Sequence, residues 1–319
     1  MNAETPKAKP FQFLADVREP VSLKELSERA LRAEGSGYHG LVIPDHLIHQ
    51  LSPVPVMAAV AAVSERLRIG AFVFNNDLRH PAVVAQDLAS LDVLSEGRLD
   101  VNIGAGWNKP EYDAIGIPFD PTPVRQERLA EAIAILKGCL RGGPFSFEGK
   151  HYRIADHDAG PPAVQQPHPP FMIGGGGRRT LELAAREANV VGLAPRIRGS
   201  RGDALSLTWE ATAEKIEWVR AAAGDRFPDL TFNVYPSGVT PTVTDNAVGA
   251  AREAADSLER RLGVRLTDEQ VLSSPHIYIG SVESLAEKFV GLRESLGISS
   301  VMVGELGPLD GVVERLSGR

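Results

Sequence analysis

The sequence predicts one domain, residues 1–319, with the α/β fold class of a (β/α)8 TIM barrel. Eight short apolar runs, rich in β-branched residues, recur along the chain, and segments with helical periodicity separate them. Most of the runs lack alternation, as expected of strands buried on both faces of a parallel sheet. Eight strand–helix units favour a closed barrel, and an open doubly wound sheet is the alternative. A single barrel accommodates 319 residues, since barrels span roughly 200 to 400.

The predicted strands are Phe11–Val17, Gly40–His46, Arg68–Phe74, Arg98–Gly104, Pro170–Gly174, Val190–Ala194, Leu230–Pro236 and Ser300–Gly304. Three helix starts carry local signals. Ser22–Glu25 has the spacing of a capping box, Thr122 followed by Pro123 resembles an N-cap with a first-turn proline, and Gly280-Ser281 precedes an apolar stripe.

Three segments are longer than a simple connection and predict insertions after strands 4, 6 and 7. Gly142–Pro169 contains a predicted small hairpin, Arg196–Leu207 is a basic loop, and Thr240–Pro275 contains an extra helix. Long segments of this kind within a compact domain are usually functional.

Composition excludes several classes of protein. The chain is 43% hydrophobic and 24% charged, and no apolar run approaches the ~18 residues of a membrane helix. The polar N-terminus lacks the apolar core of a secretory signal, so we expect a cytoplasmic protein. A net charge of −7 argues against nucleic acid as a partner. The one cysteine, Cys139, cannot form an internal disulfide or a structural zinc site, and we expect it in the core.

In a barrel, chemistry takes place at the carboxyl ends of the strands. The polar or glycine-rich segments expected there are Asp45-His46, Asn75-Asn76, Gly104–Asn108, Gly174–Arg179, Pro195-Arg196 and Glu305.

The glycine run Gly174–Gly177 predicts a phosphate site, because it precedes a helix that begins with two arginines. Glycines permit close approach of the backbone, and a helix N-terminus directs N–H groups at an anion. The alternative is a tight strand-to-helix turn with solvated arginines. The run matches neither the Walker loop nor the dinucleotide fingerprint.

His46 is a candidate proton donor, and the alternative is a structural histidine beside a capping Asp45. The spacing Asp45-His46-x-x-His49 also admits a metal site. We predict no metal, because barrel metallohydrolases need further histidine ligands, which strand one does not supply. Trp107 could form the wall of a planar ligand site or pack beneath the first insertion.

Several motifs, in this order, resemble the luciferase-like monooxygenase superfamily, whose members have a bacterial-luciferase-like barrel. They are Leu41–His46, Leu67–Gly70, Arg79–Ala82, Ala89–Arg98, Asn102–Trp107 with Glu111-Tyr112, Phe147–Gly149 with Tyr152, and Ile173–Gly175. The resemblance covers about residues 11 to 304. Within the superfamily the chain is most similar to the branch that uses the deazaflavin coenzyme F420.

The resemblance implies roles for individual residues. It makes His46 and Asp45 the catalytic candidates, facing the deazaflavin ring, with His46 as proton donor or acceptor. It implies a cis peptide bond between Phe72 and Val73 behind the ring. The remaining implied contacts are Ala105, Gly106, Trp107 and Asn108 along the ring and ribityl chain, and Gly175, Gly176, Gly177 and Arg178 at the phosphate.

Two positions depart from the family pattern. Asn189-Val190 stands where Asp-Gly is common, and Trp107 stands where sugar-phosphate dehydrogenases of the group often carry an acidic residue. The substrate of those enzymes therefore does not transfer to this chain. Separately, Arg196, Arg198 and Arg201 could screen the anionic tail of F420, or could belong to a solvated loop.

The sequence thus predicts an F420-dependent oxidoreductase that moves a hydride between C5 of the deazaflavin and a small organic substrate. One alternative is an FMN-dependent monooxygenase that uses reduced flavin and oxygen. Another is a noncatalytic barrel that binds flavin or deazaflavin. The resemblance also implies a homodimer.

Overall fold

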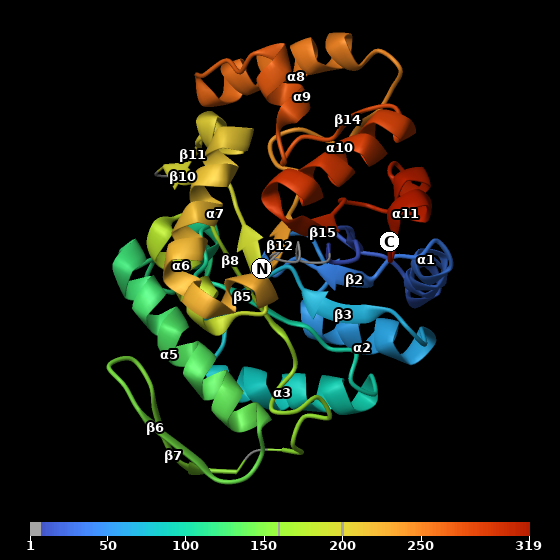
Figure 1. Cartoon of the computed structure of the whole chain (residues 1–319). Helices are drawn as coiled ribbons and strands as arrows, with labels where there is room; N and C mark the ends of the chain where they lie inside the picture. Colours follow the sequence, from blue (N-terminus) through green and yellow to red (C-terminus); the bar gives the residue numbers. More distant parts are fainter. Residues whose placement is uncertain (1–7, 159, 199–200) are drawn as a thin grey trace, which may run out of the picture. The chain divides into compact units, whose positions relative to one another are not determined.

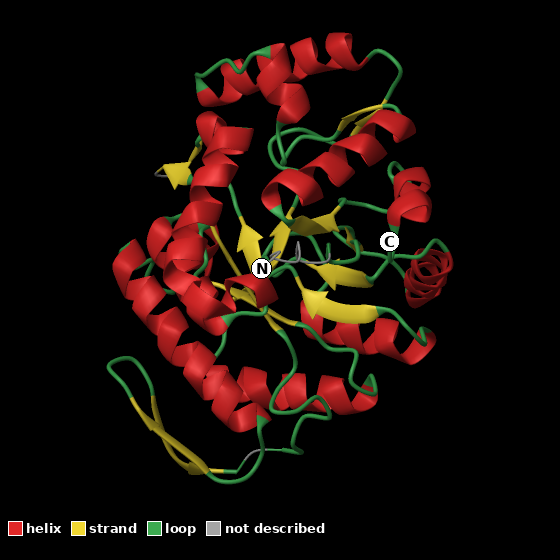
Figure 2. Cartoon of the chain, viewed as in Figure 1, coloured by secondary structure: helices red, strands yellow, loops and turns green. Residues whose placement is uncertain are grey.

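A computed structural model describes residues 8–158, 160–198 and 201–319. The predicted alternation of strands and helices is confirmed (Figures 1 and 2). The strands are β1 Gln12–Asp16, β2 Gly40–Ile43, β3 Arg68–Ala71, β4 Phe74–Asn75, β5 Val101–Gly104, β6 Phe145–Glu148, β7 Arg153–His157, β8 Phe171–Gly175, β9 Val190–Leu193, β10 Ile197–Arg198, β11 Arg201–Gly202, β12 Thr231–Val234, β13 Thr242–Val243, β14 Ile279–Gly280 and β15 Ile298–Met302.

The α-helices are α1 Leu23–Gly35, α2 Pro53–Val63, α3 Pro81–Leu94, α4 Lys109–Ile115, α5 Thr122–Leu140, α6 Arg178–Glu187, α7 Trp209–Ala223, α8 Ala247–Leu262, α9 Asp268–Ser273, α10 Val282–Leu296 and α11 Asp310–Leu316. Three short 3-10 helices are η1 Asn76–Leu78, η2 Ala204–Leu207 and η3 Gly224–Asp229.

Nine strands form one sheet in the order β3-β2-β1-β15-β12-β9-β8-β5-β4. Every registered pair in this sheet is parallel. The two strands that end this order, β3 and β4, are consecutive in the chain and separated only by Phe72-Val73, and a parallel bridge joins Ile69 to Leu99 beside β5. The sheet therefore closes on itself, which confirms the predicted barrel. Eight barrel strands count as nine because the third is interrupted at Phe72-Val73.

The chain divides into two compact units, which are described separately. One unit consists of residues 16–35 and 40–174, and the other of residues 1–15, 36–39 and 175–319. Single-domain organisation over 1–319 stays a prediction.

In the unit of residues 16–35 and 40–174, α3 packs against α5. The side chains of Leu88, Leu129 and Leu136 are fully buried there. Cys139, near the end of α5, is a free, buried thiol, and burial raises its pKa. The β6–β7 hairpin follows α5 and is antiparallel, as predicted for the first insertion (Figure 1).

In the unit formed mainly by residues 175–319, α6 packs against α7. The predicted extra helix is α8, which has a small hydrophobic core of its own with α9. That core includes Leu258 of α8, Val271 of α9 and Leu207 of the second insertion. The two later insertions are thereby confirmed: Arg196–Leu207 contains β10, β11 and η2, and Thr240–Pro275 contains β13, α8 and α9. Strand β13 pairs with β14, which follows the predicted insertion.

The helix-start predictions have three outcomes. Ser281 is the N-cap of α10, and its hydroxyl accepts from the Ser284 N–H at 3.2 Å, as expected. Thr122 is not an N-cap: α5 begins at Thr122 and Pro121 precedes it as the cap, so that prediction is wrong by one residue. The Ser22 hydroxyl accepts from the Glu25 N–H at 3.2 Å, while the Glu25 carboxylate pairs with Arg29 at 2.7 Å instead of closing the box.

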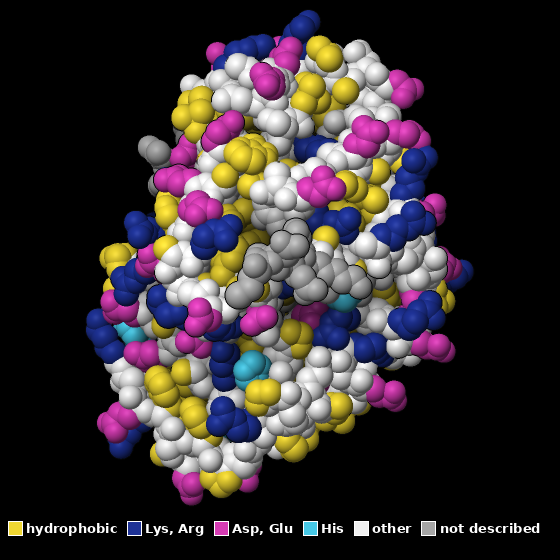
Figure 3. Space-filling model, viewed as in Figure 1, with side chains coloured by type: hydrophobic (Ala, Val, Ile, Leu, Met, Phe, Trp, Pro, Cys, Tyr) yellow, Lys and Arg dark blue, Asp and Glu magenta, His cyan; other side chains and the backbone are white. Residues whose placement is uncertain are grey.

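The surface visible in Figure 3 carries interspersed acidic and basic side chains, in keeping with the balanced composition. Among the described helices, none combines the length and the apolar character needed to cross a membrane.

Candidate active site

His46 lies just beyond the carboxyl end of β2, and a carboxylate holds its ring. Nδ1 of His46 is 2.9 Å from Oε1 of Glu111, and the imidazole side chain is 27% exposed. The Trp107 indole approaches the ring edge-on, with centroids 5.6 Å apart. Nε2 has no hydrogen-bond partner among the described residues, so it is the nitrogen open to a ligand.

Glu111, in the first turn of α4, belongs to one of the motifs that carry the resemblance, but the sequence analysis assigned it no functional role. Its residue is only 4% exposed. Besides His46, its carboxylate accepts from the Leu47 N–H at 3.3 Å and from the Asn108 side-chain amide. The carboxylate therefore joins the loop after β2 to the turn after β5. The signal in the sequence was an acidic residue in the first turn of a short helix behind a strand end.

Asp45 is buried, and its carboxylate is fully engaged. It accepts from both terminal nitrogens of the Arg79 guanidinium, at 2.7 and 3.1 Å, and from the Asn75 N–H at 2.9 Å. A charge-assisted pair of this kind fixes geometry as well as charge. Asp45 thus anchors the end of β2 to the start of η1, and a direct catalytic role for it stays a prediction.

A second buried ion pair supports the same region. Arg128 of α5 binds the Asp77 carboxylate at 2.9 and 3.0 Å, and the Tyr112 hydroxyl donates to Asn75 Oδ1 at 2.9 Å. Burial, reinforced by the charge of Asp77, raises the pKa of Tyr112. The hydroxyl therefore remains protonated and keeps η1 tied to α4.

The turn after β5 requires glycine at position 106, and Gly104, the last residue of β5, is closely surrounded. Gly106 has φ +73°, and a Cβ there would overlap the Tyr112 hydroxyl. At Gly104 a Cβ would lie 3.0 Å from Val73 Cγ2. The peptide bond between Phe72 and Val73 is cis, as the resemblance implied. The Arg125 guanidinium donates to the backbone carbonyl oxygens of Ala105 and Gly106 and so holds this turn in place.

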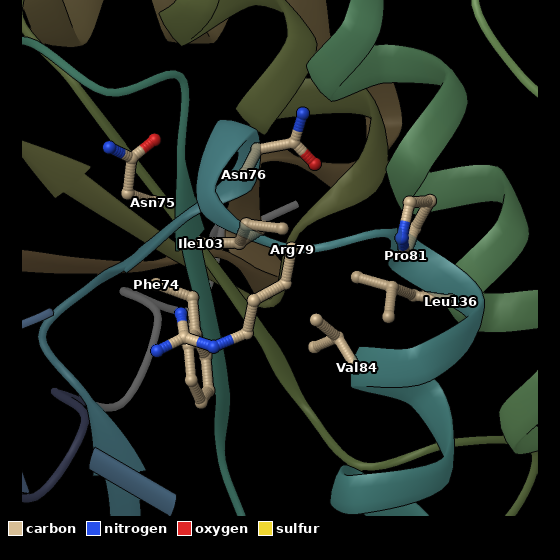
Figure 4. Close-up of a pocket in the computed structure, with 8 residues that line it drawn as sticks. All are labelled: Phe74, Asn75, Asn76, Arg79, Pro81, Val84, Ile103 and Leu136. Atoms are coloured by element: carbon tan, nitrogen blue, oxygen red, sulfur yellow. The ribbon is translucent and has the colours of Figure 1, made fainter. Parts of the chain in front are cut away.

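A small cavity of about 10 Å³ lies beneath η1, which is space for about one water molecule. Figure 4 shows Val84 from α3 and Leu136 from α5 directed toward it, with the Arg79 guanidinium beside the Phe74 ring. The lining residues are Phe74, Asn75, Asn76, Arg79, Pro81, Val84, Ile103 and Leu136.

The predicted phosphate loop leads into α6, as expected. Gly177 is the N-cap residue and has no side chain to satisfy the first N–H groups of the helix. A Cβ at Gly176 would lie 2.6 Å from the Pro195 carbonyl oxygen, so only glycine fits there. The Arg178 guanidinium is exposed and pairs with Glu182 at 2.8 Å. The loop thus leads into a helix N-terminus that has no side-chain cap and begins with a basic side chain, and such a helix start can bind an anion.

In the basic loop after β9, the Arg196 side chain already has partners within the protein. Arg196 pairs with Glu214 at 3.0 Å and lies over the Trp218 ring at 5.2 Å. The side chains of Arg198 and Arg201 lie outside the described residues. The proposed role of this loop in screening an anionic tail therefore stays a prediction.

A search of the described residues finds no group of three or more His, Cys, Asp or Glu side chains arranged to hold a metal ion. His49 is exposed, and His46 is engaged by Glu111.

Comparisons with known proteins agree with this arrangement. A family model described as luciferase-like monooxygenase matches residues 8–278. An FMNH2-dependent dimethylsulfone monooxygenase from Pseudomonas putida is 36% identical over 138 residues, a match that covers 43% of this chain and 38% of that relative.

Solved structures with the same fold match nearly the whole chain. A coenzyme F420 dependent tetrahydromethanopterin reductase from Methanopyrus kandleri has a TM-score of 0.75 at 20% identity, covering 97% of this chain and 98% of that one. A monooxygenase from Streptomyces bottropensis has a TM-score of 0.72 at 20% identity, covering 96% and 97%. An F420-dependent secondary alcohol dehydrogenase has a TM-score of 0.71 at 19% identity, covering 96% and 98%.

The family model spans most of the sequence, and the closed parallel sheet matches structures of this kind over their full length. Because the family model matches well over half of the sequence, the chain belongs to the luciferase-like monooxygenase family.

Proposed function

We propose that this protein is an F420-dependent oxidoreductase that transfers a hydride between the deazaflavin and a small organic substrate. The observation that carries the proposal is the His46 imidazole, held at Nδ1 by a buried carboxylate and open at Nε2. Hydride transfer to or from carbon must be accompanied by movement of a proton, and a positioned imidazole can move it near neutral pH.

The residues present fit a bound deazaflavin. Gly104 places no side chain beside Val73, where a Cβ would come within 3.0 Å of the valine, and this suits the close approach of a flat ring. Trp107 is 55% exposed, so its indole is available to a planar ligand. The uncapped start of α6 fits a phosphate. When bound, F420 supplies a two-electron hydride carrier at carbon, which the protein itself lacks.

The protein's own residues then bind, orient and move a proton. Gly175, Gly176, Gly177 and Arg178 would hold the phosphate, and Ala105, Gly106, Trp107 and Asn108 would line the ring and ribityl chain. His46 would give a proton from Nε2 to the substrate when the substrate is reduced, or accept one in the reverse direction. Asp45, paired with Arg79, keeps the end of β2 in place.

An FMN-dependent monooxygenase is the second candidate, and one observation favours it. The Pseudomonas putida relative at 36% identity is FMNH2-dependent. We favour F420 because the sequence motifs are most similar to the F420-dependent branch, and because the FMNH2-dependent match covers only 38% of that relative. The whole-chain structural neighbours include both F420-dependent enzymes and monooxygenases, so they do not separate the two candidates. Both cofactors carry a phosphate that suits the start of α6.

Titration of the purified protein with F420 and with FMN, followed by fluorescence at moderate salt, tests the proposal. Tight binding of F420 with weak binding of FMN is the expected result. The reverse preference would assign the protein to the oxygen-using enzymes, and binding of neither would contradict the phosphate site. A substrate screen with reduced F420 follows the expected outcome.

The proposal includes a homodimer, which rests on the family resemblance. Light scattering after size-exclusion chromatography measures the mass of the assembly, and a monomer would contradict this part.

A further inference from the structure

We propose that Glu111 is a positioning residue that fixes the tautomer of His46 and so selects Nε2 as the nitrogen that exchanges a proton with the substrate. This inference rests on the proposed function for its consequence in catalysis. Its structural basis, the contact between a buried carboxylate and one imidazole nitrogen, does not depend on which cofactor binds.

The contact constrains the proton because a carboxylate can only accept. Oε1 of Glu111 lies 2.9 Å from Nδ1 of His46, so that nitrogen must carry a hydrogen for the bond to form. In neutral imidazole the other nitrogen then has a lone pair. Nε2 is therefore the acceptor before proton uptake and the donor after it.

The surroundings of Glu111 keep its two oxygens in fixed roles. Oε2 accepts from the Leu47 N–H at 3.3 Å, and the Asn108 amide donates to Oε1. All three partners are donors, and the residue is 4% exposed, so little water can replace them. The loop that carries His46 and the turn that carries Trp107 and Asn108 are thus set by the same carboxylate.

Replacing Glu111 by glutamine changes one acceptor into a donor and leaves the size unchanged. If the amide oxygen faces the Leu47 N–H, the amide nitrogen faces His46 Nδ1, which must then be an acceptor and lose its hydrogen. If the amide oxygen faces His46, two N–H donors oppose each other at Leu47. The second arrangement keeps the Nδ1–H form but opposes a backbone N–H that cannot turn away, whereas in the first the Asn108 amide can turn its oxygen toward the new donor. The first arrangement is therefore favoured, and the preference for the Nδ1–H form weakens.

Nitrogen NMR of the protein with 15N-labelled histidine tests the tautomer directly, in the absence of any cofactor. The His46 signals are identified by their loss in His46→Gln. At mildly alkaline pH the wild-type ring is expected to have a protonated Nδ1 and an unprotonated Nε2. In Glu111→Gln the Nε2–H form is expected to become a major or dominant species.

Glu34→Gln is the matched control. The Glu34 carboxylate also accepts three N–H groups, from Glu65, Arg66 and Leu67 at 3.0, 2.5 and 3.1 Å, but none belongs to a histidine. This variant should leave the His46 signals as in wild type.

With a substrate in hand, Glu111→Gln should lower kcat on the order of 10²-fold with KM nearly unchanged. A wild-type His46 that carries its hydrogen on Nε2 would overturn the inference without any variant. So would a folded Glu111→Gln protein with wild-type tautomer and kcat. Failure of F420 to bind would contradict the proposed function but not the tautomer assignment, so the two failures are distinguishable.

Discussion

Two regions of the molecule bury ionisable groups in opposite ways. At the end of β2, the Asp45 carboxylate is matched by the Arg79 guanidinium, and the Glu111 carboxylate by the His46 ring. In the other compact unit, Lys215 is fully buried and its ammonium donates to two carbonyl oxygens, of Ala194 at 2.9 Å and Ser206 at 3.2 Å.

The difference lies in what compensates the charge. Burial, reinforced by the charge of Arg196, lowers the pKa of Lys215 to about 7. Burial and the charge of Lys215 lower the pKa of His276 to about 3. Carbonyl oxygens satisfy hydrogen bonds but do not neutralise a charge, so the second region gives up its protons readily. In the first region each buried carboxylate has a side-chain partner, and under the proposed function the His46 ring also transfers a proton.

The largest expected effect is a loss of activity when His46, the proposed proton donor of the first region, is replaced. His46→Ala should lower kcat by about 10²- to 10⁴-fold, because the substrate loses its proton donor, while F420 binding changes little. Steady-state kinetics with reduced F420, together with the binding titration, measures both. His49→Gln, an exposed histidine three residues later, is the control and should retain wild-type kcat. Full activity of His46→Ala would remove His46 from the mechanism.

The ion pair at the end of β2 supplies the next effect. Arg79→Met should reduce the free energy of unfolding by about 3 kcal/mol, because the buried Asp45 carboxylate loses its counter-charge. Urea denaturation measures the change. The double variant Asp45→Asn/Arg79→Met should recover part of the loss, and strictly additive losses would show that the pair is not coupled.

The region around Lys215, where carbonyl oxygens accept from the lysine, should make the free energy of unfolding depend on pH. Because the pKa of Lys215 falls from 10.5 unfolded to about 7 folded, the unfolded state binds more protons between these values. Stability contributed through Lys215 therefore rises with pH across this window, by at most about 1.4 kcal/mol per pH unit.

Lys215→Met should remove that contribution and flatten the pH dependence of the unfolding free energy above pH 7. Lys24→Met is the control, since the Lys24 side chain is 88% exposed. An unchanged slope in Lys215→Met would mean that the lysine keeps its charge in the folded protein.

The smallest expected effect is a loss of cofactor affinity when a glycine of the run Gly174–Gly177 is replaced. Gly176→Ala should weaken both F420 and FMN by about tenfold, since a Cβ would lie 2.6 Å from the Pro195 carbonyl oxygen and displace the loop from its anion-binding position. Gly177→Ala is the matched control, because the space around its Cβ is open. Equal losses in the two variants would contradict the steric argument.

The sequence predicted the barrel well because strand–helix alternation is local information. The end of β2 and the glycine run after β8 followed from the same pattern. The partners of the site residues could not be predicted from this pattern, because Glu111 is 65 residues from His46 and Arg79 is 34 residues from Asp45. Such pairings depend on how strand ends meet in the closed sheet. The cis bond at Phe72-Val73 was accessible only through the family resemblance.

Cys139 has a practical consequence for experiments on this protein. The chain's one thiol is 7% exposed, and burial raises its pKa, so little reactive thiolate is present at neutral pH. A cysteine introduced at an exposed position such as Ile48, which is 60% exposed, should therefore react selectively with a maleimide dye. The native protein offers a ready background for site-specific fluorescence labelling, without removal of its own cysteine.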